Sequence, residues 1–74
     1  MAGKHRIEAA GSDDTSWHVF RRGKSKAWCS GFADALFSSH GYAARVVRES
    51  DGVVVAAVGY HPTLSVEAGP GDEQ

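Results

Sequence analysis

Apolar and polar positions alternate most clearly along two runs near the middle of the chain. The runs Ala43–Arg48 and 53–58 are rich in valine and alanine, and a short polar segment separates them. β-Branched runs on either side of a glycine-containing turn predict a β-hairpin. Alternation predicts that Glu49 pairs with Val53, so that residues 50–52 form a three-residue loop whose glycine is left-handed.

This register gives the hairpin one apolar face that fits a protein core. A two-residue turn at Asp51-Gly52 would place charged residues on both faces, so the longer loop is favoured. The residues of the apolar face are Tyr42, Ala44, Val46, Val54, Ala56, Val58 and Tyr60.

The opposite face of the hairpin is less polar than a solvated face usually is. It carries Arg45, Val47 and Val55, and Val47 is expected directly opposite Val55. Two interpretations stay open: scattered surface apolar residues, which soluble proteins commonly have, or a contact surface. A contact surface here would bind a protein partner or a second copy of the chain, which would make a homodimer.

The first half of the chain predicts strands followed by one helix. Residues 4–9 and 17–22 are expected to be strands, and Gly23-Lys24 a tight turn that leads to a short third strand at residues 27–29. Helical spacing of apolar residues follows, and Gly41 stands at the C-cap position; the spaced residues are Phe32, Ala35, Leu36 and Ser39.

The start of this helix has two possible positions. We expect Ser30 to be the N-cap. A helix that begins at Ser25 also aligns Trp28 with Phe32, but it ranks second because Gly31 would then cost about 1 kcal/mol in the helix interior.

The predicted fold is a small two-layer α+β domain, in which one amphipathic helix packs on one face of an antiparallel sheet. Its element order is β-β-(β)-α-β-β, where the bracketed strand is residues 27–29. The single domain is expected to span residues 4–61. Residues 62–74 hold both prolines and an acidic end, so they are expected to form a flexible acidic tail.

Length and composition narrow the class of protein. A chain of 74 residues holds one domain, and its net charge of −1 gives no global attraction to nucleic acid or to an anionic membrane. No apolar run approaches the ~18 residues of a membrane span. The single cysteine, Cys29, and the absence of a visible secretory signal predict a cytoplasmic protein.

The sequence contains no complete catalytic or metal-binding motif. Gly23-Lys24-Ser25 matches the end of a phosphate-binding loop, but His18 stands where that loop needs its first glycine. The histidines and Cys29 lack the paired spacing of metal ligands. Cys29 is expected to be a small buried residue. We therefore expect no enzymatic activity, no cofactor and no metal.

One segment concentrates positive charge. Its four cations lie within six residues and are flanked by aromatic residues; the cations are Arg21, Arg22, Lys24 and Lys26. Three interpretations stay open: a solvated turn that protects a sheet edge, a seat for an acidic protein surface, or a nucleic-acid-binding hairpin tip. Trp28 and Trp17 are either core residues or, if exposed beside these cations, candidate contact residues.

A short stretch after the predicted helix resembles one known family. Gly41-Tyr42-Ala43-Ala44-Arg45-Val46-Val47 is similar to the start of the second strand in the peptidoglycan-binding SPOR domains. The resemblance covers less than a third of the chain, and no second helix or final strand follows Tyr60. We therefore do not assign the chain to that family.

These observations favour a small non-catalytic protein-protein interaction module. The expected contact residues are Arg21, Arg22, Lys24, Lys26, Trp28, Arg45, Val47 and Val55. By analogy with other small plain proteins, we expect an accessory or inhibitory factor, of the kind that phages and mobile elements use against a larger host complex. The alternative is a nucleic-acid-binding module that uses residues 21–26.

Overall fold

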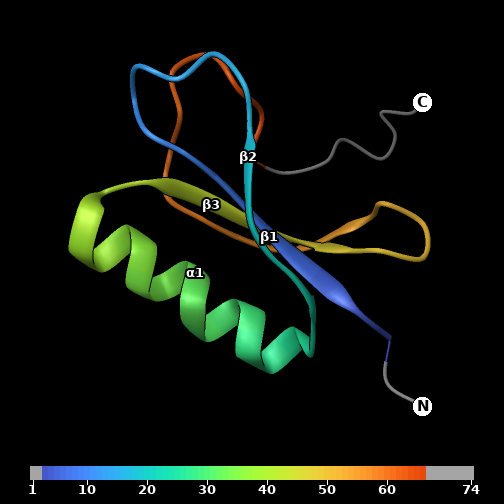
Figure 1. Cartoon of the computed structure of the whole chain (residues 1–74). Helices are drawn as coiled ribbons and strands as arrows, with labels where there is room; N and C mark the ends of the chain where they lie inside the picture. Colours follow the sequence, from blue (N-terminus) through green and yellow to red (C-terminus); the bar gives the residue numbers. More distant parts are fainter. Residues whose placement is uncertain (1–2, 67–74) are drawn as a thin grey trace.

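The computed structural model describes residues 3–66, which form four strands and one helix (Figure 1). The sheet is antiparallel and its strand order is β2-β1-β3-β4. Helix α1 covers one face of this sheet, so the predicted two-layer α+β fold is confirmed. The elements are β1 (His5–Ala10), β2 (His18–Lys24), α1 (Lys26–His40), β3 (Ala43–Arg48) and β4 (Val54–Val58).

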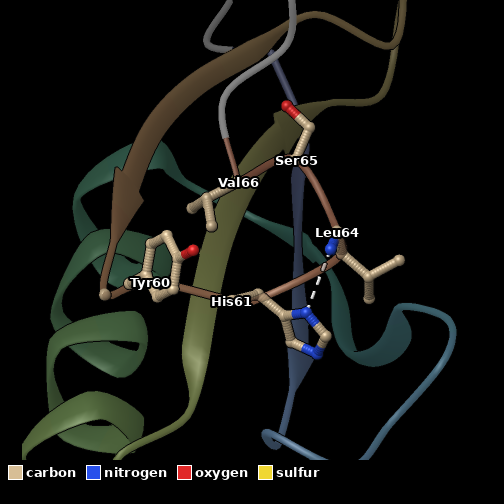
Figure 2. Close-up of a pocket in the computed structure, with 6 residues that line it drawn as sticks. Tyr60, His61, Leu64, Ser65 and Val66 are labelled. Atoms are coloured by element: carbon tan, nitrogen blue, oxygen red, sulfur yellow. Dashed lines mark hydrogen bonds between the residues drawn. The ribbon is translucent and has the colours of Figure 1, made fainter.

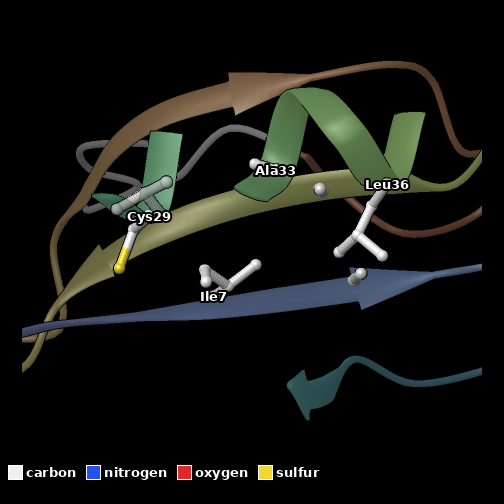
Figure 3. Packing of buried hydrophobic residues seen from close by; sticks show 7 residues of the cluster. Ile7, Cys29, Ala33 and Leu36 are labelled. Atoms are coloured by element: carbon white, nitrogen blue, oxygen red, sulfur yellow. The ribbon is translucent and has the colours of Figure 1, made fainter. Parts of the chain in front are cut away.

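The core lies between α1 and the two central strands. Cys29, Ala33 and Leu36 point from α1 toward Ile7 of β1 (Figure 3), and all four are buried. Small residues in both layers let the helix approach the sheet closely, but they also keep the core small. A core of this size rarely supplies more than about 3–5 kcal/mol, so the fold depends on its caps and ion pairs as well.

The helix begins earlier than predicted, and the third strand at residues 27–29 is absent. Ser25 is the N-cap, with extended φ and ψ of −69° and 160°, and its Oγ accepts a hydrogen bond from the Trp28 N–H at 3.1 Å. The prediction of Ser30 as N-cap was wrong because this cap and an extra helical turn outweigh the cost of Gly31. The Gly41 C-cap is confirmed, with φ of 70° and its N–H 2.8 Å from the Phe37 carbonyl oxygen.

The basic segment therefore does not form a hairpin tip. Residues 18–24 belong to β2, and the chain passes through Ser25 directly into α1. Gly23 takes a left-handed φ of 73° just before this junction, which supplies the bend that a tight turn was expected to make.

The predicted hairpin register is correct at its open end and wrong near the loop. Val46 pairs with Ala56 as expected, but a register shift follows, so Val47 pairs with Val54 and not with Val55. Four residues close the loop, since the Arg48 N–H donates to the Val53 carbonyl oxygen at 2.8 Å. The side chain of Asp51 explains this closure.

Asp51 stabilises the four-residue loop from inside. Its carboxylate binds the Arg48 guanidinium, with Nη2 2.7 Å from Oδ2, and Oδ1 accepts from the Val53 N–H at 3.2 Å. Gly52 is left-handed as predicted, with φ of 73°. The bulge that follows turns Val55 to the core side of the sheet, where it packs against the buried cluster.

The far face of the sheet, which is the face opposite α1, is not the exposed apolar surface that was expected. Val47 is only 1% exposed. Arg45 projects from this face, and its Nη1 donates to the Ser65 carbonyl oxygen at 3.2 Å. The described part of the predicted tail, residues 62–66, is thus held to the domain, and the remaining residues 67–74 lie outside the described residues.

Candidate interaction surface

The junction of β2 and α1 brings two cations and two aromatic rings together on the surface. We call Arg21, Lys24, Trp28 and Phe32 the basic aromatic patch. Trp28 and Phe32 are one helical turn apart, which places their side chains on the same side of α1. Lys24 is the last residue of β2, and Ser25 caps the helix that carries both rings.

The rings of the patch are stacked, and each has a cation over it. The centroids of Trp28 and Phe32 lie 5.4 Å apart with an interplanar angle of 22°. The Lys24 ammonium lies 4.9 Å from the Trp28 centroid, and the Arg21 guanidinium carbon lies 5.8 Å from the Phe32 centroid. Such cation–π contacts contribute about 0.5–1 kcal/mol at exposed sites, so they orient the side chains without burying them.

Trp28 stays 43% exposed in this arrangement. Large aromatic residues usually bury most of their surface, and a tryptophan that is half exposed beside cations is a typical contact residue of interfaces. Trp17 differs, because it is partly buried and its ring lies against Arg45 and His61, away from these cations. The sequence left open whether each tryptophan is a core residue or an exposed contact residue. Trp28 is exposed beside the cations, whereas Trp17 is partly buried.

The cations of the chain divide into paired and unpaired groups. Among the described residues, Arg21, Lys24 and Lys26 have no carboxylate within ion-pair distance. Arg22 belongs to the paired group, because its Nη1 lies 2.8 Å from Glu49 Oε2. The structure therefore keeps Arg21 and Lys24 together in the patch, places Lys26 beside them at the first helical position, and separates Arg22 from them.

The other predicted contact residues are not part of this surface. Arg45 is engaged with Glu8, whose Oε1 lies 2.7 Å from both Nε and Nη2 of the arginine. Arg6 Nε donates to Glu8 Oε2 at 2.7 Å. Burial alone would raise the pKa of Glu8, but the hydrogen bonds from Arg6 and Arg45 outweigh it and lower the pKa below its usual value. Val47 is buried on the far face of the sheet, whereas Val55 packs against the core cluster, and the two residues do not pair with each other.

Phe32 is the patch residue that the favoured sequence interpretation missed. The sequence analysis listed it only as an apolar position of the predicted helix, and in the structure it is partly buried against the core cluster while its ring stacks with Trp28. The signal was present in the second-ranked helix start at Ser25, which puts Trp28 and Phe32 on one stripe. Prediction of the patch therefore required the correct helix start, because Trp28 lies on the same helix as Phe32 only if Ser25 is the N-cap.

Cys29 and His61 are both buried, and neither side chain is free to act on a ligand at the surface. Burial raises the pKa of the Cys29 thiol, the charge of Glu49 adds to the rise, and Lys24 opposes it. In residues 3–66, no three histidine, cysteine, aspartate or glutamate side chains are grouped to hold a metal ion. His61 is buried and uses both ring nitrogens: Nδ1 accepts from the Leu64 N–H at 3.0 Å, and Nε2 lies 3.0 Å from the Gly11 carbonyl oxygen.

A hollow of about 330 Å³ lies within the C-terminal segment (Figure 2). His61 is the polar ring that lines the hollow, and its Nδ1 accepts the hydrogen bond from the Leu64 N–H that Figure 2 draws. Nδ1 therefore has no capacity left for a ligand. The residues that line it are Gly59, Tyr60, His61, Leu64, Ser65 and Val66. We therefore place the candidate site at the basic aromatic patch and not in this hollow.

Comparisons with protein families, with curated proteins and with solved structures found no match for this chain. No helix in the described part of the chain has the length and apolar character needed to cross a membrane. The geometry of the patch is therefore the basis for a functional proposal.

Proposed function

We propose that the protein is a non-catalytic protein-binding module that uses the basic aromatic patch to bind an acidic protein surface. The observation that carries the proposal is Trp28, which is 43% exposed while its ring is fixed between elements and flanked by Lys24. A rigid, half-exposed tryptophan provides contact area at low entropic cost. Unpaired cations beside it complement carboxylates and favour fast association with an acidic partner.

The ring geometry favours a protein over a single-stranded nucleic acid. Base stacking needs a free aromatic face, and the Trp28 ring already has Phe32 stacked against it and the Lys24 ammonium over it. A base that stacks on Trp28 competes with these side chains for the ring, whereas a carboxylate can pair with Lys24 where it stands.

A nucleic acid is nevertheless the second candidate, supported by one specific feature. The first turn of α1 holds no acidic residue, and Lys24 and Lys26 flank its N-cap. The N-terminus of a helix favours anions, so phosphate would also be attracted to this end of α1.

Binding of two labelled probes separates the candidates. Fluorescence anisotropy is measured with an oligo-glutamate peptide and with a mixed-sequence single-stranded DNA, each with the full chain. We expect the peptide to bind more tightly than the DNA, and Trp28→Ala and Lys24→Gln each to weaken peptide binding about 10-fold, which corresponds to about 1.4 kcal/mol.

Lys4→Gln is the matched control, because Lys4 is exposed, has no ion-pair partner in residues 3–66 and lies outside the patch. It removes the same charge as Lys24→Gln and is expected to change the affinity less than twofold. Equal losses in the two lysine variants would show a non-specific charge effect and would contradict the proposal. Tighter binding of DNA, lost in Lys24→Gln alone, would establish the second candidate instead.

The proposal extends to the biological role of the protein. A module that only binds would act as an accessory or inhibitory factor on a larger host complex, in the cytoplasm, as the sequence suggested. The support for this role is the small fold and the basic aromatic patch on its surface.

A further inference from the structure

Strand β4 is a sheet edge without the usual protection. It pairs with β3 on one side, and within residues 3–66 no other segment forms a backbone hydrogen bond with its outer side. Residues 53–58 read Val-Val-Val-Ala-Ala-Val and contain no charge and no proline. Edge strands of soluble proteins generally carry lysine, proline or a cover, because free backbone groups and apolar side chains invite another strand to pair.

Strand β2, the other edge of the sheet, is protected in the expected way. It carries Arg21, Arg22 and Lys24, and most of its residues are exposed. Two β2 strands placed side by side would bring these cations together, which destabilises pairing. The sheet thus has one edge that charge protects from pairing, β2, and one open edge that lacks such protection, β4.

Exposed apolar side chains gather at the open edge. Val53 directly precedes β4 and is 42% exposed, and Tyr60, two residues after β4, is 80% exposed. Phe37 of α1 is 44% exposed and lies beside the end of β4, since a Cβ at Gly59 would be 3.1 Å from Phe37 Cδ1. An apolar edge strand with exposed apolar residues at both ends is typical of an interface.

We propose that β4 pairs antiparallel with β4 of a second copy of the chain, which joins two four-stranded sheets into one continuous sheet. A second copy fits because the strand is uncharged, so self-pairing brings no like charges together. Cross-strand pairs of β-branched residues stabilise such pairing beyond the backbone hydrogen bonds.

Twofold pairing at β4 also closes the assembly. Both open edges are used in the dimer, and the two remaining edges are cationic β2 strands that repel a third copy. The homodimer is thus formed by β4, which contains Val55, and not by the buried Val47.

Mass in solution tests this proposal. Sedimentation equilibrium of the full chain is expected to give twice the chain mass of 7.8 kDa. Ala57 is exposed on β4, so Ala57→Lys adds an edge charge without touching the core and is expected to give 7.8 kDa. Val19→Lys is the control on β2, where Val19 is 43% exposed, and it is expected to keep the doubled mass.

Mixing two variants with opposite charges at position 57 makes the test specific to pairing between β4 strands. Ala57→Glu is also expected to be monomeric, and an equal mixture with Ala57→Lys is expected to recover the doubled mass, because opposite charges then meet across the interface. Circular dichroism confirms that each variant is folded. A wild-type mass of 7.8 kDa up to the millimolar range, a dimer that survives Ala57→Lys, or a mixture that stays monomeric would each overturn the proposal.

Discussion

The Arg45 guanidinium carbon lies 4.4 Å from the centre of the Trp17 ring, and the same guanidinium holds Glu8. The loop between β1 and β2 is thereby tied to the middle of the far face, because Trp17 immediately precedes β2. Glu8 is 7% exposed and also binds Arg6, so one carboxylate connects the charges of this face. This arrangement makes the stability of the fold depend on the ionisation of Glu8.

We expect the free energy of unfolding to fall in acid because of Glu8. Its pKa is lowered in the folded state, so the ionised carboxylate stabilises the fold at a pH above the usual value of 4.5. The stabilisation is lost as the pH falls from 4.5 through the lower folded value. Urea unfolding at a series of pH values between 7 and 3 measures this loss.

Glu8→Gln isolates the contribution of this residue. It is expected to cost about 1.5–3 kcal/mol at pH 7, because hydrogen bonds to a charged group are lost, and to flatten the acid dependence. Asp13→Asn is the control, since Asp13 is exposed and has no ion-pair partner in the described chain. An unchanged acid dependence in Glu8→Gln would show that other carboxylates control it.

The N-cap at Ser25 is expected to stabilise the helix that carries the patch. Ser25→Ala removes the hydrogen bond to the Trp28 N–H and is expected to cost about 1 kcal/mol, whereas Ser25→Asp is expected to retain most of the stability. Thermal unfolding followed by circular dichroism measures both. The same measurement on Ser30→Ala is a control: a larger loss there than at Ser25 would contradict the observed start of α1.

Two glycines are expected to respond in opposite directions to alanine. Gly59 has φ of 87°, and a Cβ there would lie 3.1 Å from the Ala43 Cα and the Tyr42 carbonyl oxygen, so Gly59→Ala is expected to cost about 1–3 kcal/mol. Gly31 lies in α1 with open space around it, so Gly31→Ala is expected to gain about 0.5–1 kcal/mol. Denaturant midpoints of the two variants would contradict the structure if they moved in the same direction.

Cys29 is expected to react slowly with thiol reagents in the folded protein. Its side chain has no exposed surface, and burial raises the pKa of the thiol, so reaction requires opening of the fold. With a stability of about 3 kcal/mol, the native rate is expected to be roughly 100-fold below that in urea. A native rate equal to the unfolded rate, measured with Ellman's reagent, would contradict the burial of Cys29.

Much of the fold was predictable because local patterns determined it. Alternation along Ala43–Arg48 and the glycine at position 41 identified the hairpin and the end of the helix. The helix start was not predicted, because the cost of Gly31 was weighed more heavily than the Ser25 N-cap and the extra helical turn that outweigh it. The register near the loop was missed because the Asp51–Arg48 ion pair, which closes a four-residue loop, competes with simple alternation.

The candidate site was predictable only in part. Arg21, Lys24 and Trp28 were expected to act together, and the structure brings them together with Phe32. The ion pair of Arg22 and the burial of Val47 were not visible in the sequence, because the first depends on Glu49 and the second on β1, and both partners are distant along the chain. The open edge at β4 required the strand order, which no local pattern contains.

The central claim is that an acidic partner binds at the basic aromatic patch. Its most direct test is an NMR titration of the ¹⁵N-labelled protein with the oligo-glutamate peptide, in which the indole N–H signals of the two tryptophans are followed. Trp28 lies in the basic aromatic patch and Trp17 lies away from it, so one spectrum contains both the reporter and its control. A Trp28→Phe sample assigns the two peaks. We expect the Trp28 peak to shift with saturation while the Trp17 peak stays in place. A shift of Trp17 alone, or no shift of Trp28 at saturating peptide, would contradict binding at the patch.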